Sequence, residues 1–238
     1  MKKAYFNWST GKDSALALYK IQQGSKLQVD RLLTIVNTDF DRVSMHGLRN
    51  GLLERQAQAL KLPLQKVALA GNVSMVTYDA VMRKTMEELY SEGYRDTVFG
   101  DIFLEDLRAY RDGKLAEVGV KGHYPLWKKD TKTLMTEFLD LGFKAITVCV
   151  NAKLLDASFC GRELDASFLS DLPDGIDPCG ENGEFHTFVY DGPIFNRAVD
   201  FKMGEIVKKS YTPSSDGEDC YQVEVSWDNA FWYCDLLP

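Results

Sequence analysis

The first residues able to do chemistry form the stretch Ser9–Ser14, whose sequence is STGKDS. It follows the apolar run Tyr5–Trp8 and opens into a helical pattern. A helix N-terminus leaves four backbone N–H groups unpaired and carries partial positive charge, so it attracts phosphate. Gly11 allows close backbone approach, Lys12 is expected to be an exposed loop lysine, and Asp13 can cap the helix or position magnesium. The stretch therefore predicts a phosphate-binding loop.

This stretch is not a Walker A loop, because no glycine stands five residues before Gly11 and Asp13 follows Lys12. The alternative interpretation is an ordinary Ser/Thr/Gly turn capped by Asp13. Its position after the first strand of an α/β pattern, where open parallel sheets bind ligands, favours phosphate binding.

A second group of reactive residues is the stretch Gly180–Thr187, with the sequence GENGEFHT. If a strand begins at Phe185, Glu184 and His186 share one face, because side chains alternate along a strand. Carboxylates beside a histidine can bind a metal, transfer protons or hold an amino group. The alternative is a glycine turn with solvated acids. Zinc is disfavoured, since the sequence has three histidines and no C-x-x-C pair.

A third group begins at Gly100 and Asp101, directly after the expected strand Thr97–Phe99. Glu105 and Arg108 stand four and seven residues after Asp101, which places the three on one face of the expected helix. Asp101 can then hold magnesium, and Arg108 can meet a phosphate or a substrate carboxylate. The alternative is a capped helix with an exposed Glu105–Arg108 pair.

Cys179 lies beside the second group, but it has no histidine partner nearby in the sequence and is interpreted as structural.

The elements that must position these groups alternate between strands and helices over the first 150 residues. We expect strands at 5–8, 31–36, 64–68, 97–99 and 144–150, and helices at 13–24, 48–60, 75–90, 104–117 and from the N-cap Asp130 to near Gly142. Such alternation predicts a Rossmann-like parallel sheet with helices on both faces. The pattern breaks after about Val150, and strands are expected at 185–190, 201–211 and 221–233.

We expect two parts, a phosphate-binding domain over residues 1–128 and a smaller α+β substrate-binding region over residues 129–238. Charge differs between them: residues 1–128 carry 19 Lys and Arg against 15 Asp and Glu, and residues 129–238 carry 9 against 20. The basic part suits a polyphosphate, and the acidic part disfavours a nucleic-acid partner.

Composition narrows the class of protein further. The 238 residues include no apolar run long enough for a membrane span, and the N-terminus has no signal-peptide pattern. Five cysteines without a C-x-x-C pair argue against a disulfide framework and fit a reducing compartment. We therefore expect a cytoplasmic protein without a membrane partner.

Beyond these patterns, Asn7–Ser14 resembles the S-G-G-x-D-S signature of the PP-loop ATP pyrophosphatases, the adenine nucleotide alpha-hydrolase-like superfamily, with Thr10 in place of the usual second glycine. Three further stretches resemble one branch of it, the diphthine–ammonia ligase family: Ser44–Gly47, Phe99–Arg108 and Gly180–Thr187. The resemblance covers nearly the whole chain.

The resemblance implies a PP-loop fold and a ligase that adenylates a carboxylate with ATP and Mg²⁺ and then amidates it with ammonia. The acceptor is a modified residue of an elongation factor or a small molecule, and free ammonium is the expected nitrogen donor. Two alternatives stay open: a PP-loop enzyme acting on another small molecule or on RNA, and a non-enzymatic nucleotide-binding protein.

The resemblance also implies roles for single residues. The nucleotide would meet Ser9, Thr10, Gly11, Lys12, Asp13, Ser14, His46 and Gly100, with His46 near the adenine, and Mg²⁺ would meet Asp13 and Asp101. Catalysis is assigned to Lys12, Asp101, Glu181, Glu184 and His186. The acceptor would meet Glu105, Arg108, Gly180, Glu181, Asn182, Glu184 and Thr187. We expect Gly180–Thr187 to handle the acceptor, separately from the ATP loop.

Overall fold

A parallel sheet carries the N-terminal part of the computed structural model, which describes residues 1–43, 47–71, 73–211 and 229–238. β1 and β4 both pair with Leu32 and Leu33 of β2, so they lie on its opposite edges, and the described parallel strands run in the order β4-β2-β1-β5-β6. These strands are β1 (Lys2–Asn7), β2 (Leu27–Asn37), β4 (Leu64–Leu69), β5 (Asp96–Val98) and β6 (Lys121–His123). The short β3 (Arg42–Val43) pairs antiparallel with the end of β2.

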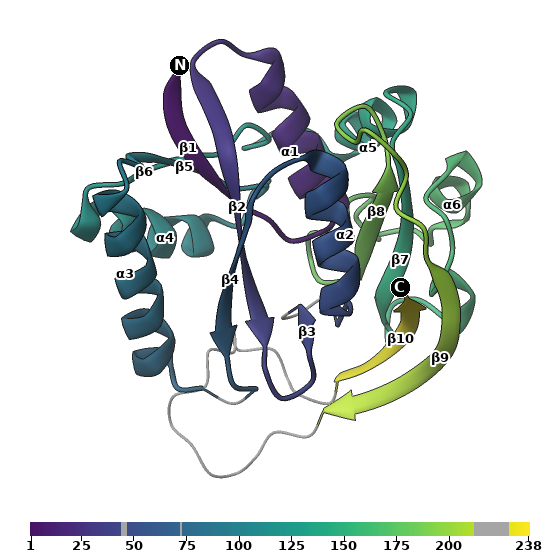
Figure 1. Ribbon diagram of the computed structural model, residues 1–238. Coiled ribbons are helices and arrows are strands. Elements are labelled where there is room, and N and C mark those ends of the chain that lie inside the picture. The colour runs from purple at the N-terminus through teal and green to yellow at the C-terminus, as the bar shows by residue number, and fades with distance from the viewer. Residues whose placement is uncertain (44–46, 72, 212–228) are drawn as a thin grey trace.

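Helices cover both faces of this sheet, as side-chain alternation requires. Phe6 and Trp8 of the β1 side pack in one core cluster with α1 (Lys12–Gln23) and α2 (Asn50–Leu60). Tyr5, which points to the other face, packs in a second cluster with α3 (Met75–Ser91) and α4 (Glu105–Val118), seen at the left of Figure 1. The expected α/β fold class is confirmed.

A second, antiparallel sheet lies beside α1 and α2, in the order β8-β7-β10-β9 (Figure 1). Its strands are β7 (Lys144–Asn151), β8 (Phe185–Asp191), β9 (Lys202–Tyr211) and β10 (Asn229–Leu237). The same C-terminal part of the chain contains α5 (Thr131–Asp140), a 3-10 turn (Ala157–Phe159) and α6 (Ala166–Asp171). The expected smaller C-terminal α+β region is therefore present.

The sequence pattern placed 144–150 with the parallel strands, and this is wrong. β7 pairs antiparallel with β8 and β10, and the last strand of the parallel sheet is instead β6, which the sequence analysis missed. A β–α alternation predicts strands without saying which sheet they join, and three residues are too few for a periodicity. Part of the strand expected at 221–233 lies outside the described residues.

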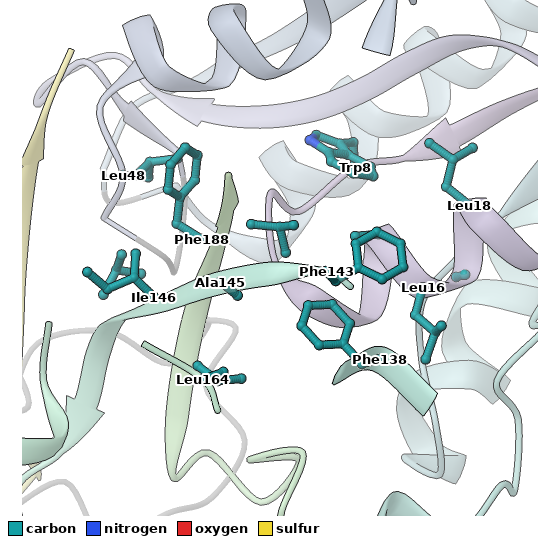
Figure 2. Close-up of a cluster of buried hydrophobic side chains, with 14 of the residues drawn as sticks. Trp8, Leu16, Leu18, Leu48, Phe138, Phe143, Ala145, Ile146, Leu164 and Phe188 are labelled. Carbon is teal, nitrogen blue, oxygen red and sulfur yellow. The ribbon is translucent and has the colours of Figure 1, made fainter. Parts of the chain in front are cut away.

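One hydrophobic core joins the two sheets. In Figure 2, Leu16 of the N-terminal part lies close to Phe138 and Phe143 of the C-terminal part, and Leu48 lies beside Phe188. The rings of Phe138 and Phe143 stack with centroids 4.8 Å apart. The two parts are thus packed against each other across the expected boundary at 128 and 129, and that boundary stays a prediction. None of the helices in the described segments is both long and apolar enough to cross a membrane.

Candidate active site at the ends of β1 and β5

The phosphate loop leaves the carboxyl end of β1 and turns directly into α1. Ser9 and Ser14 close it, with their hydroxyl oxygens 2.8 Å apart, and the Gly11 N–H points to the Ser9 hydroxyl at 3.4 Å. Gly100, after β5, packs against the start of α1 so closely that a Cβ there would lie 2.9 Å from the Ser14 nitrogen. Since β1 and β5 flank the point where strand order reverses, the loop occupies the ligand-binding position of an open α/β sheet.

Thr10 adopts a backbone conformation that glycine favours, with φ at +76°. Its carbonyl accepts two hydrogen bonds, from the Val189 N–H of β8 at 3.0 Å and from the Gln56 amide of α2 at 3.0 Å. A β-branched residue in the left-handed region is strained, and the surrounding contacts must hold it there. The threonine thus preserves the turn that the resemblance assigns to glycine.

Lys12 is not the exposed loop lysine that the sequence suggested. It is the first residue of α1 and is only 3% exposed, with its ammonium 2.7 Å from Asp13 and over the Phe185 ring. Burial alone would lower the pKa of Lys12, but Asp13 and Glu181 outweigh it and raise the pKa above its usual value. The lysine therefore stays charged inside the protein.

β8 lies directly against the phosphate loop. The Lys12 N–H donates to the Thr187 hydroxyl at 3.0 Å, and the Ala15 N–H bonds to the Gly11 carbonyl at 3.1 Å. The Ala15 bond is the first regular hydrogen bond of α1, so of these two N–H groups only that of Lys12 belongs to those expected to converge on phosphate, and it is already used. The two motifs therefore lie at one site, and the division of roles between them, with Gly180–Thr187 handling the acceptor and the loop handling ATP, stays a prediction.

The turn before β8 is built around the carboxylate of Glu184, which is 2% exposed. It accepts hydrogen bonds from the backbone N–H groups of Asp177 at 3.1 Å and Asn182 at 2.8 Å, and from the Asn182 side chain at 3.2 Å. Gly180 has φ at +69°, and a Cβ there would lie 2.8 Å from the Phe185 carbonyl oxygen, so the close turn requires glycine. Glu184 holds this turn together.

Glu181 and His186 flank Lys12 with altered acidities. Burial and the neighbouring charge of Asp13 raise the pKa of Glu181 to about 8. Burial and the charge of Lys12 lower the pKa of His186 to about 4. At neutral pH the imidazole is uncharged, and Glu181 can exchange a proton in a range where ordinary carboxylates cannot.

Asp101 lies beside the loop, but its partner is Arg111 and not Arg108. Asp101 and Arg111 form an ion pair, and the guanidinium of Arg111 lies over the Phe99 ring. α4 begins only at Glu105, so Asp101 is not on the helix, and the argument that placed it on one face with Arg108 fails.

Glu105 and Arg108, the two remaining residues of that group, lie on α4. Arg108 bonds to Asp112 at 3.3 Å and covers Tyr124 and Trp127. Glu105 pairs with Lys128 at 2.6 Å.

The residues of these two ion pairs and two neighbours line a shallow, open cavity of about 350 Å³: Glu105, Arg108, Ala109, Asp112, Trp127 and Lys128. The Lys128 N–H bonds to the Ile102 carbonyl at 2.6 Å, one residue after Asp101, so the cavity lies next to the site. Glu105 and Arg108 are thus near the site but outside its centre.

Several residues of this site were not found from the sequence. Gln56 on α2, Asp177 in the turn and Arg111 on α4 each bond to a predicted site residue. A glutamine or arginine on a helix carries no motif, and only the fold shows what it faces. His46 lies outside the described residues. Within 1–43, 47–71, 73–211 and 229–238, no group of three or more His, Cys, Asp or Glu side chains could hold a metal ion.

Cys179 is buried, and its backbone N–H donates to Asp177 at 2.8 Å while its thiol approaches the Thr131 carbonyl at 3.4 Å. Burial raises the pKa of the Cys179 thiol above its usual range, so it is protonated at neutral pH. This agrees with its interpretation as structural.

Family models cover most of the sequence. Residues 1–122 match the diphthamide synthase N-terminal domain, and residues 130–233 match the diphthamide synthase C-terminal domain. The chain belongs to the diphthamide synthase family. The family expected from the motifs is thereby confirmed.

Named relatives of this diphthamide synthase family member are diphthine–ammonia ligases. That of Schizosaccharomyces pombe is 32% identical over 198 residues, which are 77% of this chain and 32% of the relative. That of Danio rerio is 28% identical over 167 residues, 63% of this chain and 65% of the relative. The Bos taurus protein is 26% identical, covering 72% and 70%. The chain thus spans about a third of the fission yeast relative and just under two thirds of the zebrafish one.

Among solved structures, the U34-tRNA thiolase of Methanococcus maripaludis is 16% identical, with a TM-score of 0.38 over 59% of this chain and 57% of the thiolase. We draw no functional conclusion from so distant a likeness.

Proposed function

We propose that this protein is an ATP-dependent ligase that converts a carboxylate of its acceptor into an amide, consuming ammonia and releasing AMP and pyrophosphate. The observation that carries the proposal is the joining of two motifs at the switch point: Thr187 accepts the backbone N–H of Lys12, and Glu181 interacts with Lys12 and Asp13. A nucleotide-binding module would need the loop alone. The family membership and the names of the relatives point to the same activity.

In the first step, an acceptor carboxylate oxygen attacks the α-phosphorus of ATP, and the bond to pyrophosphate breaks. The Ser9–Ser14 loop and the charged Lys12 are suited to hold the phosphates and offset the charge on the departing pyrophosphate. Their placement on a helix N-terminus requires no rearrangement of the fold as the charge develops.

In the second step, ammonia attacks the acyl carbon, AMP leaves, and the nitrogen loses a proton. Glu181 is suited to orient ammonium and take its proton, since burial and Asp13 raise its pKa to about 8. Glu184, buried within the turn, would act by holding Glu181 and Asn182 in place, and His186 by completing the wall as a neutral side chain.

Asp13 and Asp101 suit Mg²⁺ by their chemistry, because Mg²⁺ prefers one or two carboxylates together with phosphate oxygens. Each carboxylate is paired with a cation, Asp13 with Lys12 and Asp101 with Arg111, so both are positioned at the loop before ATP arrives. When bound there, Mg²⁺ would supply charge neutralisation for the phosphates. The carboxylates of Asp13 and Asp101 therefore suit a Mg²⁺ ion that binds together with ATP.

The acceptor side of the site is the cavity beside Asp101, lined among others by Arg108 and Trp127. Arg108 can exchange its ion pair with the half-exposed Asp112 for a carboxylate of the acceptor. The modified residue of an elongation factor, diphthine, is the acceptor that the family name indicates, and a small-molecule carboxylate is the alternative. A cytoplasmic location is part of the same proposal.

The deciding experiment incubates the protein with ATP, Mg²⁺ and ammonium, with and without diphthine-bearing elongation factor, and separates the nucleotides by chromatography. We expect acceptor-dependent AMP and an acceptor mass lower by about 1 Da, the change from acid to amide. ADP as the main product, or AMP formation indifferent to every carboxylate tried, would contradict the proposal.

An Arg108→Met variant separates the acceptor cavity from the ATP loop. We expect its KM for the acceptor to rise about tenfold, the factor expected for 1.4 kcal/mol of lost ion pairing, while KM for ATP stays within twofold. Arg83→Met is the matched control, because Arg83 also pairs with a glutamate one turn along its helix, on the exposed surface of α3.

A further inference from the structure

Gln56 is a fully enclosed polar side chain beside the phosphate loop, with 0% exposure. It lies on α2, and its side-chain amide joins three separate elements. Its oxygen accepts from the Trp8 indole at 2.8 Å, and its NH₂ group donates to the Thr10 carbonyl at 3.0 Å and the Val189 carbonyl at 2.6 Å. The end of β1, the loop and β8 therefore meet at one amide.

The partners of this amide fix its orientation. An indole nitrogen can only donate, so the oxygen of Gln56 must face Trp8. The NH₂ group then faces two carbonyl oxygens, which can only accept. No other orientation satisfies all three groups, and no other standard side chain of this length offers one acceptor and two donors.

The Thr10 carbonyl is the point where this amide acts on the phosphate loop. Thr10 holds φ at +76°, a conformation that is strained for a residue with a Cβ. Its carbonyl receives Val189 N–H from one side of the loop and Gln56 from α2. Two donors on one oxygen fix the plane of the peptide that leads into Gly11, whose N–H faces the loop interior at Ser9.

We propose that Gln56 is a positioning residue of the ATP site, holding the phosphate loop in its left-handed turn at Thr10 and tying that turn to β8. The proposal rests on the proposed function in taking ATP as the ligand of the loop. It assigns to Gln56 no contact with ATP. Its effect reaches the phosphates through the Thr10–Gly11 peptide.

A purely structural glutamine would give a different pattern of effects. Its loss would lower the stability of the protein both with and without ATP, but the ATP affinity of the folded protein would stay unchanged. If Gln56 positions the loop, its substitution must change ATP affinity less in a protein whose turn at residue 10 forms without strain. Glycine at position 10 provides that condition, because it reaches positive φ without strain.

The test compares Gln56→Met, Thr10→Gly and the double variant for ATP binding by titration calorimetry and for unfolding by urea. We expect Gln56→Met to raise the ATP dissociation constant about tenfold, the factor that 1.4 kcal/mol produces, with kcat changed less than KM. In the Thr10→Gly background the same substitution should raise it less than threefold, a coupling that identifies the turn as the point of action.

Thr34→Val is the matched control. Thr34 is 3% exposed and its hydroxyl donates to the Trp8 carbonyl at 2.8 Å, so its loss removes a buried hydrogen bond next to the loop without touching Thr10. We expect lower stability and unchanged ATP affinity in this variant. An ATP affinity of Gln56→Met equal to that of Thr34→Val, or equal effects of Gln56→Met in both backgrounds, would overturn the proposal.

If Gln56→Met does not fold, Gln56→Glu replaces it. Its ionised carboxylate would face two carbonyl oxygens, and its protonated form can donate to one of them, so its ATP affinity relative to wild type should recover as pH falls from 8 to 6. A pH-independent ratio would overturn the proposal. Failure of the proposed function is recognised separately: wild-type protein would then not bind ATP, while the coupling of Gln56 and Thr10 in urea unfolding would still be measurable.

Discussion

At the scale of single residues, Lys12 has a structural role that the sequence did not predict, beside the phosphate-binding role that it did. Its ammonium is buried against Asp13, so it balances an internal carboxylate in addition to the phosphate-binding role proposed for it. We expect Lys12→Ala to abolish measurable ATP binding and also to lower the free energy of unfolding by about 2 kcal/mol, less than a fully buried pair would cost because Asp13 is 27% exposed. Calorimetry and urea unfolding check the two effects.

Lys20→Ala is the control for this prediction. Lys20 lies on the same helix and pairs with Glu137 at 2.5 Å, but its side chain is 20% exposed and lies about two helical turns beyond Lys12. Loss of this more exposed pair should cost about 0.5 kcal/mol and leave ATP binding intact. A stability change for Lys12→Ala as small as that for Lys20→Ala would contradict the buried role of Lys12.

The neutral His186 makes stability depend on pH in a defined window. Burial and Lys12 lower its pKa to about 4, from about 6.5 in an unfolded chain. Between these values the unfolded chain binds the extra proton, so stability falls as pH drops from 6.5 to 4, by up to about 1.4 kcal/mol per pH unit. In His186→Gln this slope should disappear, as measured by urea unfolding without nucleotide or metal.

The contribution of Glu181 to stability depends on pH in the opposite direction, so this residue provides the comparison. Its pKa is raised to about 8 by burial and Asp13, so between the ordinary value and 8 the folded state holds the extra proton, and stability falls as pH rises. Glu181→Gln should flatten the decline between pH 6.5 and 8 and leave the acid slope of His186 in place. A wild-type stability that is constant from pH 4 to 8, with neither variant altering it, would mean that these groups are not buried as described.

At the scale of elements, helix start points decided which site residues the sequence could find. α1 begins at Lys12, next to a glycine with extended backbone, close to the predicted start. α4 begins at Glu105, only one residue after the predicted start, but Asp101 stands four residues ahead of it in a loop. A helical-face argument holds only inside a helix, so it selected Arg108 and missed Arg111.

β8 is a second element that the sequence predicted without indicating what it contacts. The sequence predicted this strand within one residue of its observed end, and its motif was chosen on its glycines, acids and histidine. What the strand pairs with could not be read from that pattern. Thr187 and Val189 bond to Lys12 and Thr10 because β8 is an edge of the second sheet that faces the loop.

At the scale of the whole molecule, the core that runs between the two sheets predicts how the protein unfolds. Phe188 is 0% exposed and belongs to the same cluster as Trp8 and Leu16. Phe188→Ala should therefore cost about 3–5 kcal/mol. Because the core is shared, amide hydrogen exchange should show β1 and β7 losing protection together.

Phe40→Ala is the control for this truncation, because Phe40 is 70% exposed and should change stability by less than about 0.5 kcal/mol. Separate unfolding of β1 and β7 in the Phe188→Ala variant would indicate two independently stable parts. That result would favour the boundary predicted at 128 and 129 as a true domain boundary.

The sequence by itself determined the α/β class, most helix and strand positions and the family, and it singled out the stretches Ser9–Ser14 and Gly180–Thr187 as candidates for the site. These are local properties: periodicity, capping residues and short motifs are each written within some twenty neighbouring residues. Only the tertiary structure decided that β7 joins a second sheet, that Lys12 is buried, and that Gln56, Thr187 and Arg111 complete the site. Those contacts join residues 10 to 175 positions apart, as between Arg111 and Asp101 or Lys12 and Thr187, and only the packing of the two sheets on a common core brings them together.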